Sequence, residues 1–102
     1  MTEQIEQKRE QIAELCRQFH VRRLGLFGSA LGDDFDPERS DLDFVVEFET
    51  LPSGTYADTY FGLMTALEQL FGRRVDLVEP ESVRNPYFRQ EIEGKQETVY
   101  AA

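Results

Sequence analysis

Apolar positions along the chain recur with two spacings, one typical of helices and one typical of strands. From residue 3 to residue 19, and again from Tyr56 to Phe71, they recur every three or four residues and form one stripe. Gly72 is a suitable stop for the second of these helices. From Leu42 to Phe48 the apolar residues Leu42, Phe44, Val46 and Phe48 alternate with mostly polar ones, which predicts a strand with one buried face.

Further elements are marked by shorter signals. Residues 21–27 and 73–78 are apolar runs of strand length, and Asn85-Pro86 is a typical helix start. The last apolar residues, Thr98 to Tyr100, form either a short strand or a tail that docks on a partner. Strands that alternate with helices at this length predict an α/β or α+β fold, with a small sheet covered by helices on one face.

Size and charge narrow the range of functions. The chain has 102 residues, which is room for a single domain over 1–102 with one modest core. Its 20 acidic and 11 basic side chains give a net charge of −9, which argues against direct nucleic-acid binding and against an anionic membrane surface. Cys16 lies on the apolar stripe of the first helix and is expected in the core. We expect a cytoplasmic protein without a membrane span.

The candidate chemistry begins at the Leu42–Phe48 strand. Asp41 and Asp43 share the face opposite Leu42, and two neighbouring carboxylates repel each other unless a cation lies between them. Oxygen ligands in this arrangement suit Mg²⁺ shared with a substrate's phosphates. Gly28 and Ser29, at the end of the preceding strand, can offer close backbone approach and a hydroxyl to those phosphates. The alternative is that Asp41 caps a turn and Asp43 is a solvated strand residue.

Together these segments resemble a known family. A strand that ends in Gly28-Ser29, a connection containing Gly32, and Ser40-Asp41-Leu42-Asp43 leading into a second strand are similar to the minimal nucleotidyltransferase domain. This domain belongs to the DNA polymerase β-like nucleotidyltransferase superfamily, which has a third carboxylate on a later strand. Asp76, within Arg74-Val75-Asp76-Leu77-Val78, matches that position.

The resemblance implies a mixed sheet with the carboxylates on its open face, and a role for each residue. Asp41 and Asp43 would bridge two Mg²⁺ ions, and Asp76 would complete the ion on the acceptor side and assist deprotonation. Gly28 and Ser29 would hold the β- and γ-phosphates of ATP.

The resemblance also implies an activity and a partner. Members of this size are typically antitoxins that transfer AMP from ATP to a tyrosine of a HEPN-domain ribonuclease toxin, with which they form a hetero-oligomer. The alternative is a non-catalytic binding module that neutralises its partner by occlusion. An enzyme acting on a small-molecule hydroxyl would need a further substrate-binding domain.

One departure from the family concerns positive charge. Many members carry arginines directly after Gly-Ser, where this chain has Ala30 and Leu31. Another arginine would have to compensate, and the sequence does not single one out among five candidates: Arg22, Arg23, Arg39, Arg73 and Arg74.

Overall fold

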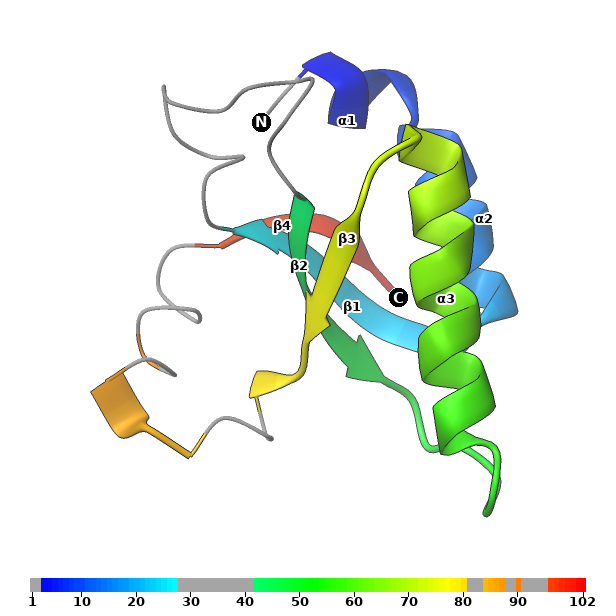
Figure 1. Ribbon diagram of the computed structural model, residues 1–102, viewed down its shortest axis with the longest axis vertical. Helices are drawn as coiled ribbons and strands as arrows, with labels where there is room; N and C mark the ends of the chain where they lie inside the picture. The colour runs from blue at the N-terminus through cyan, green and yellow to red at the C-terminus, as the bar shows by residue number, and fades with distance from the viewer. Residues whose placement is uncertain (1–2, 28–41, 81–83, 88–89, 91–95) are drawn as a thin grey trace.

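The computed structural model describes residues 3–27, 42–80, 84–87, 90 and 96–102. Their elements are, in chain order, α1 (Glu3–Gln7), α2 (Arg9–Gln18), β1 (Val21–Phe27), β2 (Leu42–Phe48), α3 (Tyr56–Phe71), β3 (Val75–Val78) and β4 (Glu97–Ala101), as Figure 1 shows. Among these residues no helix combines the length and the apolar character needed to cross a bilayer.

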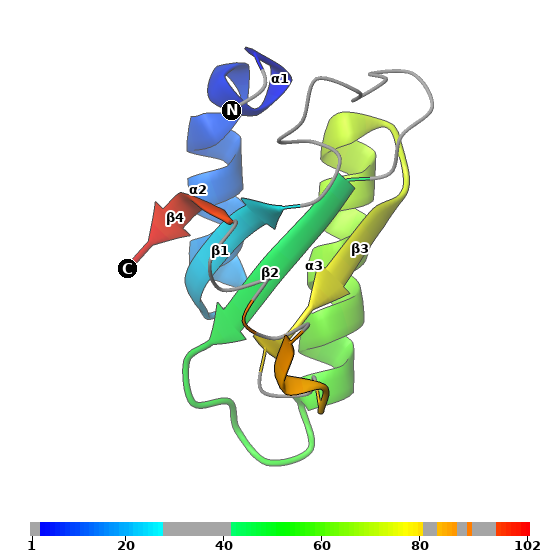
Figure 2. The same cartoon turned by 90° about the vertical axis from the view of Figure 1, so that its left-hand side faces the viewer.

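The four strands form one mixed sheet in the order β3-β2-β1-β4. Strand β1 is antiparallel to both of its neighbours, β2 and β4, whereas β2 and β3 are parallel. Helices α2 and α3 lie on the same side of this sheet, behind it in the view of Figure 2. The predicted α+β architecture with helices on one face is therefore confirmed.

The predicted N-terminal helix over 3–19 is two helices rather than one. The N–H of Lys8 bonds to the carbonyl three residues back, that of Ile5, at 3.2 Å, and this tighter turn ends α1. Helix α2 then starts with the N–H of Ile12 on the carbonyl of Lys8 at 2.9 Å. Both isoleucines are fully buried, so the apolar stripe is preserved across the break.

The core lies between the two helices and the sheet. Its buried apolar side chains include Ile12 and Cys16 of α2, Leu63 and Leu67 of α3, Leu24 and Leu26 of β1, and Leu42, Phe44 and Val46 of β2. Burial raises the pKa of the Cys16 thiol to about 12, against a small opposing effect of Arg17. The thiol is thus held neutral, which confirms its role as a core residue.

Helix α3 also closes the outer edge of the sheet. Its boundaries agree with the sequence prediction, and Gly72 follows it in the left-handed conformation at φ 65°. The Tyr60 hydroxyl donates a hydrogen bond to the Leu77 carbonyl at 2.5 Å, and Glu68 accepts one from the Val75 N–H at 3.2 Å. Two outward-facing backbone groups of β3 are therefore satisfied by side chains of the helix that covers it.

The last residues of the chain belong to the sheet. Val99 is 5% exposed in the core and Tyr100 packs against it. Of the two alternatives for this segment, the docking tail is wrong, because these apolar side chains are used within the fold. Just before β4, the Gln96 side chain lies over Gly25 of β1, where a Cβ atom would come within 2.0 Å of the Gln96 Oε1. This close approach explains a glycine in the middle of a strand.

Candidate active site on the open face of the sheet

Two of the predicted carboxylates are direct neighbours across β2 and β3. Asp43 and Asp76 are paired in register in the parallel ladder, and adjacent strands lie about 4.8 Å apart. On the other side of Asp43, Phe27 is its partner in β1. Phe27, Asp43 and Asp76 thus form one row across three strands.

Strand alternation fixes the face on which this row lies. Leu42 and Phe44, which flank Asp43, are fully buried against the helices, and Val75 and Leu77, which flank Asp76, are at most 5% exposed. Both carboxylates must therefore point to the opposite face, which we call the open face. Asp43 is half-buried there and Asp76 is exposed, so an incoming ligand can reach the pair.

The remaining predicted site residues, Gly28, Ser29 and Asp41, lie outside the described residues. Their neighbours in sequence do not: β1 ends at Phe27, and β2 begins at Leu42. Phe27 pairs with Asp43. The chain therefore leaves β1 and enters β2 at the end of the sheet that carries Asp43 and Asp76.

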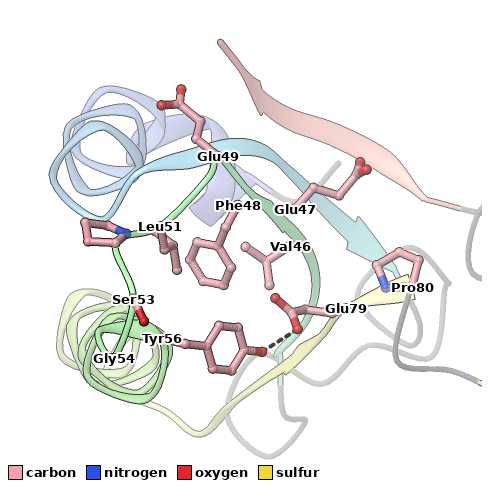
Figure 3. Close-up of a pocket in the computed structure, with 11 residues that line it drawn as sticks. Val46, Glu47, Phe48, Glu49, Leu51, Ser53, Gly54, Tyr56, Glu79 and Pro80 are labelled. Atoms are coloured by element: carbon pink, nitrogen blue, oxygen red, sulfur yellow. Dashed lines mark hydrogen bonds between the residues drawn. The ribbon is translucent and has the colours of Figure 1, made fainter.

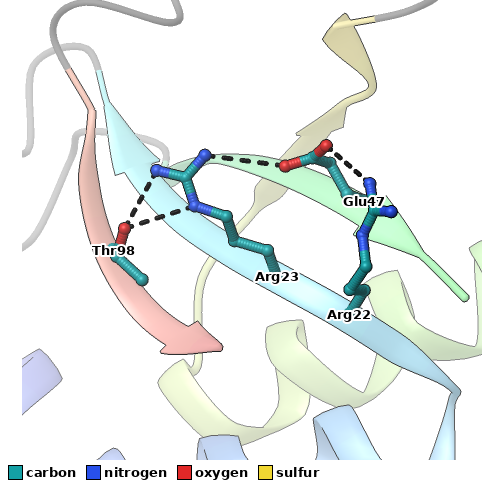
Figure 4. A network of polar contacts seen from close by, with 4 residues as sticks. All are labelled: Arg22, Arg23, Glu47 and Thr98. Carbon is teal, nitrogen blue, oxygen red and sulfur yellow. Dashed lines mark hydrogen bonds and ion pairs between the residues drawn. The ribbon is translucent and has the colours of Figure 1, made fainter. Parts of the chain in front are cut away.

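Two of the candidate arginines form ion pairs far from this end of the sheet (Figure 4). The register shifts between Val21 and Arg23, and this irregularity brings Arg22 and Arg23 to the same residue of β2, Glu47. Their ion pairs with Glu47 measure 2.9 and 3.5 Å, and Arg23 also donates to the Thr98 hydroxyl at 3.0 and 3.3 Å. Glu47 is four residues from Asp43, or roughly 13 Å along the strand.

Arg74 lies at the carboxylate end of the sheet, next to Arg73. Its carbonyl accepts a hydrogen bond from the Leu42 N–H at 3.1 Å, which holds it beside the start of β2, and its side chain is exposed. Arg73 precedes it and is half-buried. Arg39 lies outside the described residues.

The negative charge of the site affects the pKa of Tyr60 on helix α3. Burial raises the pKa of Tyr60, and the carboxylates of Glu79 and Asp76 raise it further. The phenol therefore stays protonated and donates to the Leu77 carbonyl. In the part of the chain that the structure describes, no three His, Cys, Asp or Glu residues form a metal-binding group; two carboxylates of the predicted trio are present, and the third, Asp41, falls outside it.

Two contacts near the site were missed from the sequence. Tyr60 fits the apolar stripe of its helix, and the sequence does not indicate that its hydroxyl bonds to a carbonyl 17 residues away. The Gln96 side chain on the open face did have a signal, because a glycine within a predicted strand often marks the close approach of another group. That glycine, Gly25, was instead grouped with the apolar run around it.

Comparison with known proteins identifies similar chains. Protein adenylyltransferase MntA from Thermococcus cleftensis is 40% identical over 72 residues, which cover 71% of this chain and 69% of that protein. A solved structure assigned as a minimal nucleotidyltransferase superimposes with a TM-score of 0.73 at 32% identity and covers 90% of this chain and 89% of that one.

A more distant structure shares the fold. It is the MNT antitoxin in complex with the tri-AMPylated HEPN toxin of Shewanella oneidensis, matched with a TM-score of 0.64 at 20% identity over 96% of this chain and 73% of that chain. The sequence model of the nucleotidyltransferase domain matches residues 8–99. This match includes nine-tenths of the chain, and the predicted site residues Asp43 and Asp76 are paired across the sheet. The chain therefore belongs to the nucleotidyltransferase domain family.

Proposed function

We propose that this chain transfers AMP from ATP to a hydroxyl group of a partner protein, and that it acts in this way as the antitoxin of a HEPN ribonuclease toxin. The observation that carries the proposal is the register pair of Asp43 and Asp76 on the open face. The name of the Thermococcus relative, protein adenylyltransferase, and the AMPylated toxin in the Shewanella complex support the choice of reaction and of acceptor.

The residues present fit a divalent cation. Asp43 and Asp76 offer carboxylate oxygens, the ligands that Mg²⁺ prefers, and pair directly across two strands. Asp41, which directly precedes β2 in the sequence, would complete the set. When bound, two Mg²⁺ ions would neutralise the triphosphate and lower the pKa of the acceptor hydroxyl.

The proposed reaction is an in-line displacement at the α-phosphorus of ATP. A bond forms between the acceptor oxygen and the α-phosphorus. The bond between the α-phosphorus and the oxygen that bridges it to the β-phosphorus breaks, and pyrophosphate leaves. Asp76 would hold the acceptor side and take up its proton, while Gly28 and Ser29 would hold the β- and γ-phosphates. Because ATP and Mg²⁺ are supplied in the cytoplasm, we place the reaction there.

The test is transfer of label from ATP to protein. The chain is incubated with ATP labelled at the α-phosphate, Mg²⁺ and the product of the adjacent gene, and label on that product is measured. Asp43→Asn should abolish labelling, while Glu14→Gln, which removes one exposed charge from α2, should leave it within twofold of the wild type.

The same experiment separates the alternative of a binding module. Occlusion predicts a complex in which the toxin is inactive without label, and in which Asp43→Asn neutralises it as well as the wild type does. That outcome would exclude the enzymatic proposal.

A further inference from the structure

A cavity of about 390 Å³ opens at the end of the sheet opposite the carboxylates. It is lined by residues 46–48 of β2, by Glu49, by the turn residues 51–54, and by Tyr56, Glu79 and Pro80 (Figure 3). The nearest lining residues, Val46 and Glu79, lie three residues from Asp43 and Asp76 respectively, which corresponds to roughly 10 Å of strand. The cavity is therefore separate from the proposed nucleotide site.

Apolar and aromatic side chains form part of the walls of this cavity, beside polar ones. Phe48, Leu51 and Tyr56 point toward one hollow in Figure 3. The rings of Phe48 and Tyr56 meet edge to face, with centroids 6.2 Å apart and an interplanar angle of 78°. Such walls accept a flat group with a delocalised charge, because ring faces attract cations.

One carboxylate reaches into the hollow. Glu79 accepts a hydrogen bond from the Tyr56 hydroxyl, and its carboxylate lies beside that ring in Figure 3. The other two glutamates of the lining act elsewhere. Glu47 is paired with Arg22 and Arg23, and the Glu49 carboxylate points away from the hollow in the same view.

The Glu79 charge is not compensated within the described part of the chain. Its partner there is the phenol of Tyr56, whose pKa is raised to about 12, first by burial and then by the hydrogen bond and charge of Glu79. At neutral pH this phenol is uncharged, so it gives Glu79 a hydrogen bond but no positive charge. The cavity thus combines aromatic side chains with the carboxylate of Glu79, for which the described residues supply no cation.

Aromatic side chains continue from Tyr56 along α3. Tyr56 and Phe61 are 48% and 60% exposed. Tyr60 lies between them and contacts both, with ring centroids 6.0 and 5.1 Å away. Exposed aromatic side chains are enriched at the centre of protein interfaces, whereas a site for a small free molecule would need only the hollow itself.

We propose that this cavity receives an arginine side chain presented by a partner protein, with its guanidinium on Glu79 and its flat face against the aromatic walls. Arginine fits better than lysine, because the guanidinium is planar, weakly hydrated and able to stack on a ring while it pairs with a carboxylate. The proposal does not depend on AMP transfer, since the cavity and the Asp43–Asp76 pair lie at opposite ends of the sheet.

The experiment uses an arginine whose two ends are blocked as in a polypeptide, N-acetyl-arginine N-methylamide, titrated into isotopically labelled protein and followed by NMR. The amide signals of Ser53, Gly54 and Glu79 should shift on binding, and those of Asp43 and Asp76 should not. The citrulline analogue, which has the same shape without the charge, should bind at least tenfold more weakly.

Two glutamate variants localise the effect. Glu79→Gln keeps the shape and an acceptor oxygen but removes the charge, and it should weaken binding of the blocked arginine at least fivefold. Glu49→Gln is the matched control, because it also lines the cavity but points away, and it should change affinity by less than twofold. Tyr56→Phe keeps the ring, frees Glu79 of its hydrogen bond, and should bind at least as tightly as the wild type. Melting curves of each variant check that the fold is intact.

Several results would overturn the proposal. Equal affinity for the citrulline analogue, or an unchanged affinity in a folded Glu79→Gln variant, would show that the charge plays no part. Tighter binding of free arginine than of the blocked form would indicate a metabolite site rather than a site for a partner's side chain. Shifts centred on Asp43 would place the probe at the other end of the sheet.

Discussion

Asp43 and Asp76 are register partners on parallel strands, and the residues on either side of each are buried in the apolar core. The positions of the two carboxylates are therefore set by the sheet and by the packing of their neighbours, and do not depend on a hydrogen bond between them. Like charges directly opposite each other on a sheet are unfavourable. The fold thus carries an electrostatic cost at this row that a bound cation would offset.

This cost leads to a prediction about stability. Replacing Asp76 by Asn in the metal-free protein should increase the free energy of unfolding by roughly 0–1 kcal/mol. The substitution removes a repulsion between two carboxylates, and no apolar burial is lost. Thermal melts in EDTA measure the effect, with Glu14→Gln as the control for loss of an exposed charge. Mg²⁺ with ATP should raise the melting temperature of the wild type more than that of the variant. A clear loss of stability in EDTA would mean that Asp76 supports the fold through hydrogen bonds.

Arg74 should be the arginine that matters for nucleotide affinity. It lies at the carboxylate end of β3 with an exposed side chain, while Arg22 lies at the far end on Glu47. Arg74→Ala should weaken binding of Mg²⁺-ATP at least fivefold in calorimetry, because a cation near the triphosphate is lost. Arg22→Ala should change the affinity by less than twofold. Equal losses in both variants would point to an effect of net charge instead of position.

Gly25 and Gln96 should be coupled energetically. A methyl group at position 25 would collide with the Gln96 Oε1, the end of a flexible side chain that can move aside, so Gly25→Ala should destabilise the protein by about 1 kcal/mol, the low end of the cost of overpacking. Gln96→Ala removes the obstacle, and the double variant should recover most of this loss. A double-mutant cycle from denaturant unfolding measures the coupling. If the two effects simply add, the strain arises from the backbone of Glu97, which is the next nearest group.

The Tyr56 phenol should make the protein sensitive to alkaline pH. Its pKa is raised in the fold from 10.0 to about 12, so the fold favours the protonated form. This contribution to stability is complete below pH 10 and is lost as the pH rises from 10 to about 12. Ultraviolet titration should show late phenolate formation, to which both Tyr56 and Tyr60 contribute, and Tyr56→Phe should reduce its amplitude by one phenol. Glu79→Gln should move this phenolate formation to lower pH, since it removes the nearby negative charge.

The sequence was informative where local pattern and tertiary packing agree. The period of two in β2 put Asp43 on the face opposite Phe44, and the 16 residues of α3 were bounded correctly because Gly72 can adopt the positive φ that ends a helix. Asp76 was recognised as the third carboxylate only through the resemblance to a family. Its pairing with Asp43, 33 positions earlier in the chain, cannot be predicted from either strand alone.

Other features depend on contacts between distant segments, which a local pattern does not contain. Val45 was expected on the polar side of its strand, yet it is 2% exposed in the assembled protein. The break at Lys8 arises from a tighter turn of the backbone. The apolar stripe continues through it, so the pattern of apolar residues does not indicate the break. The cavity at Glu79 requires β2, the turn after it and the end of β3 to meet, and none of these segments carries a motif by itself.

The side chains with which α3 closes β3 make the two edges of the sheet unequal. A strand that approached β3 would have to displace Tyr60 and Glu68 from the Leu77 carbonyl and the Val75 N–H before it could form a ladder. Helix α3 therefore protects this edge against intermolecular pairing and aggregation.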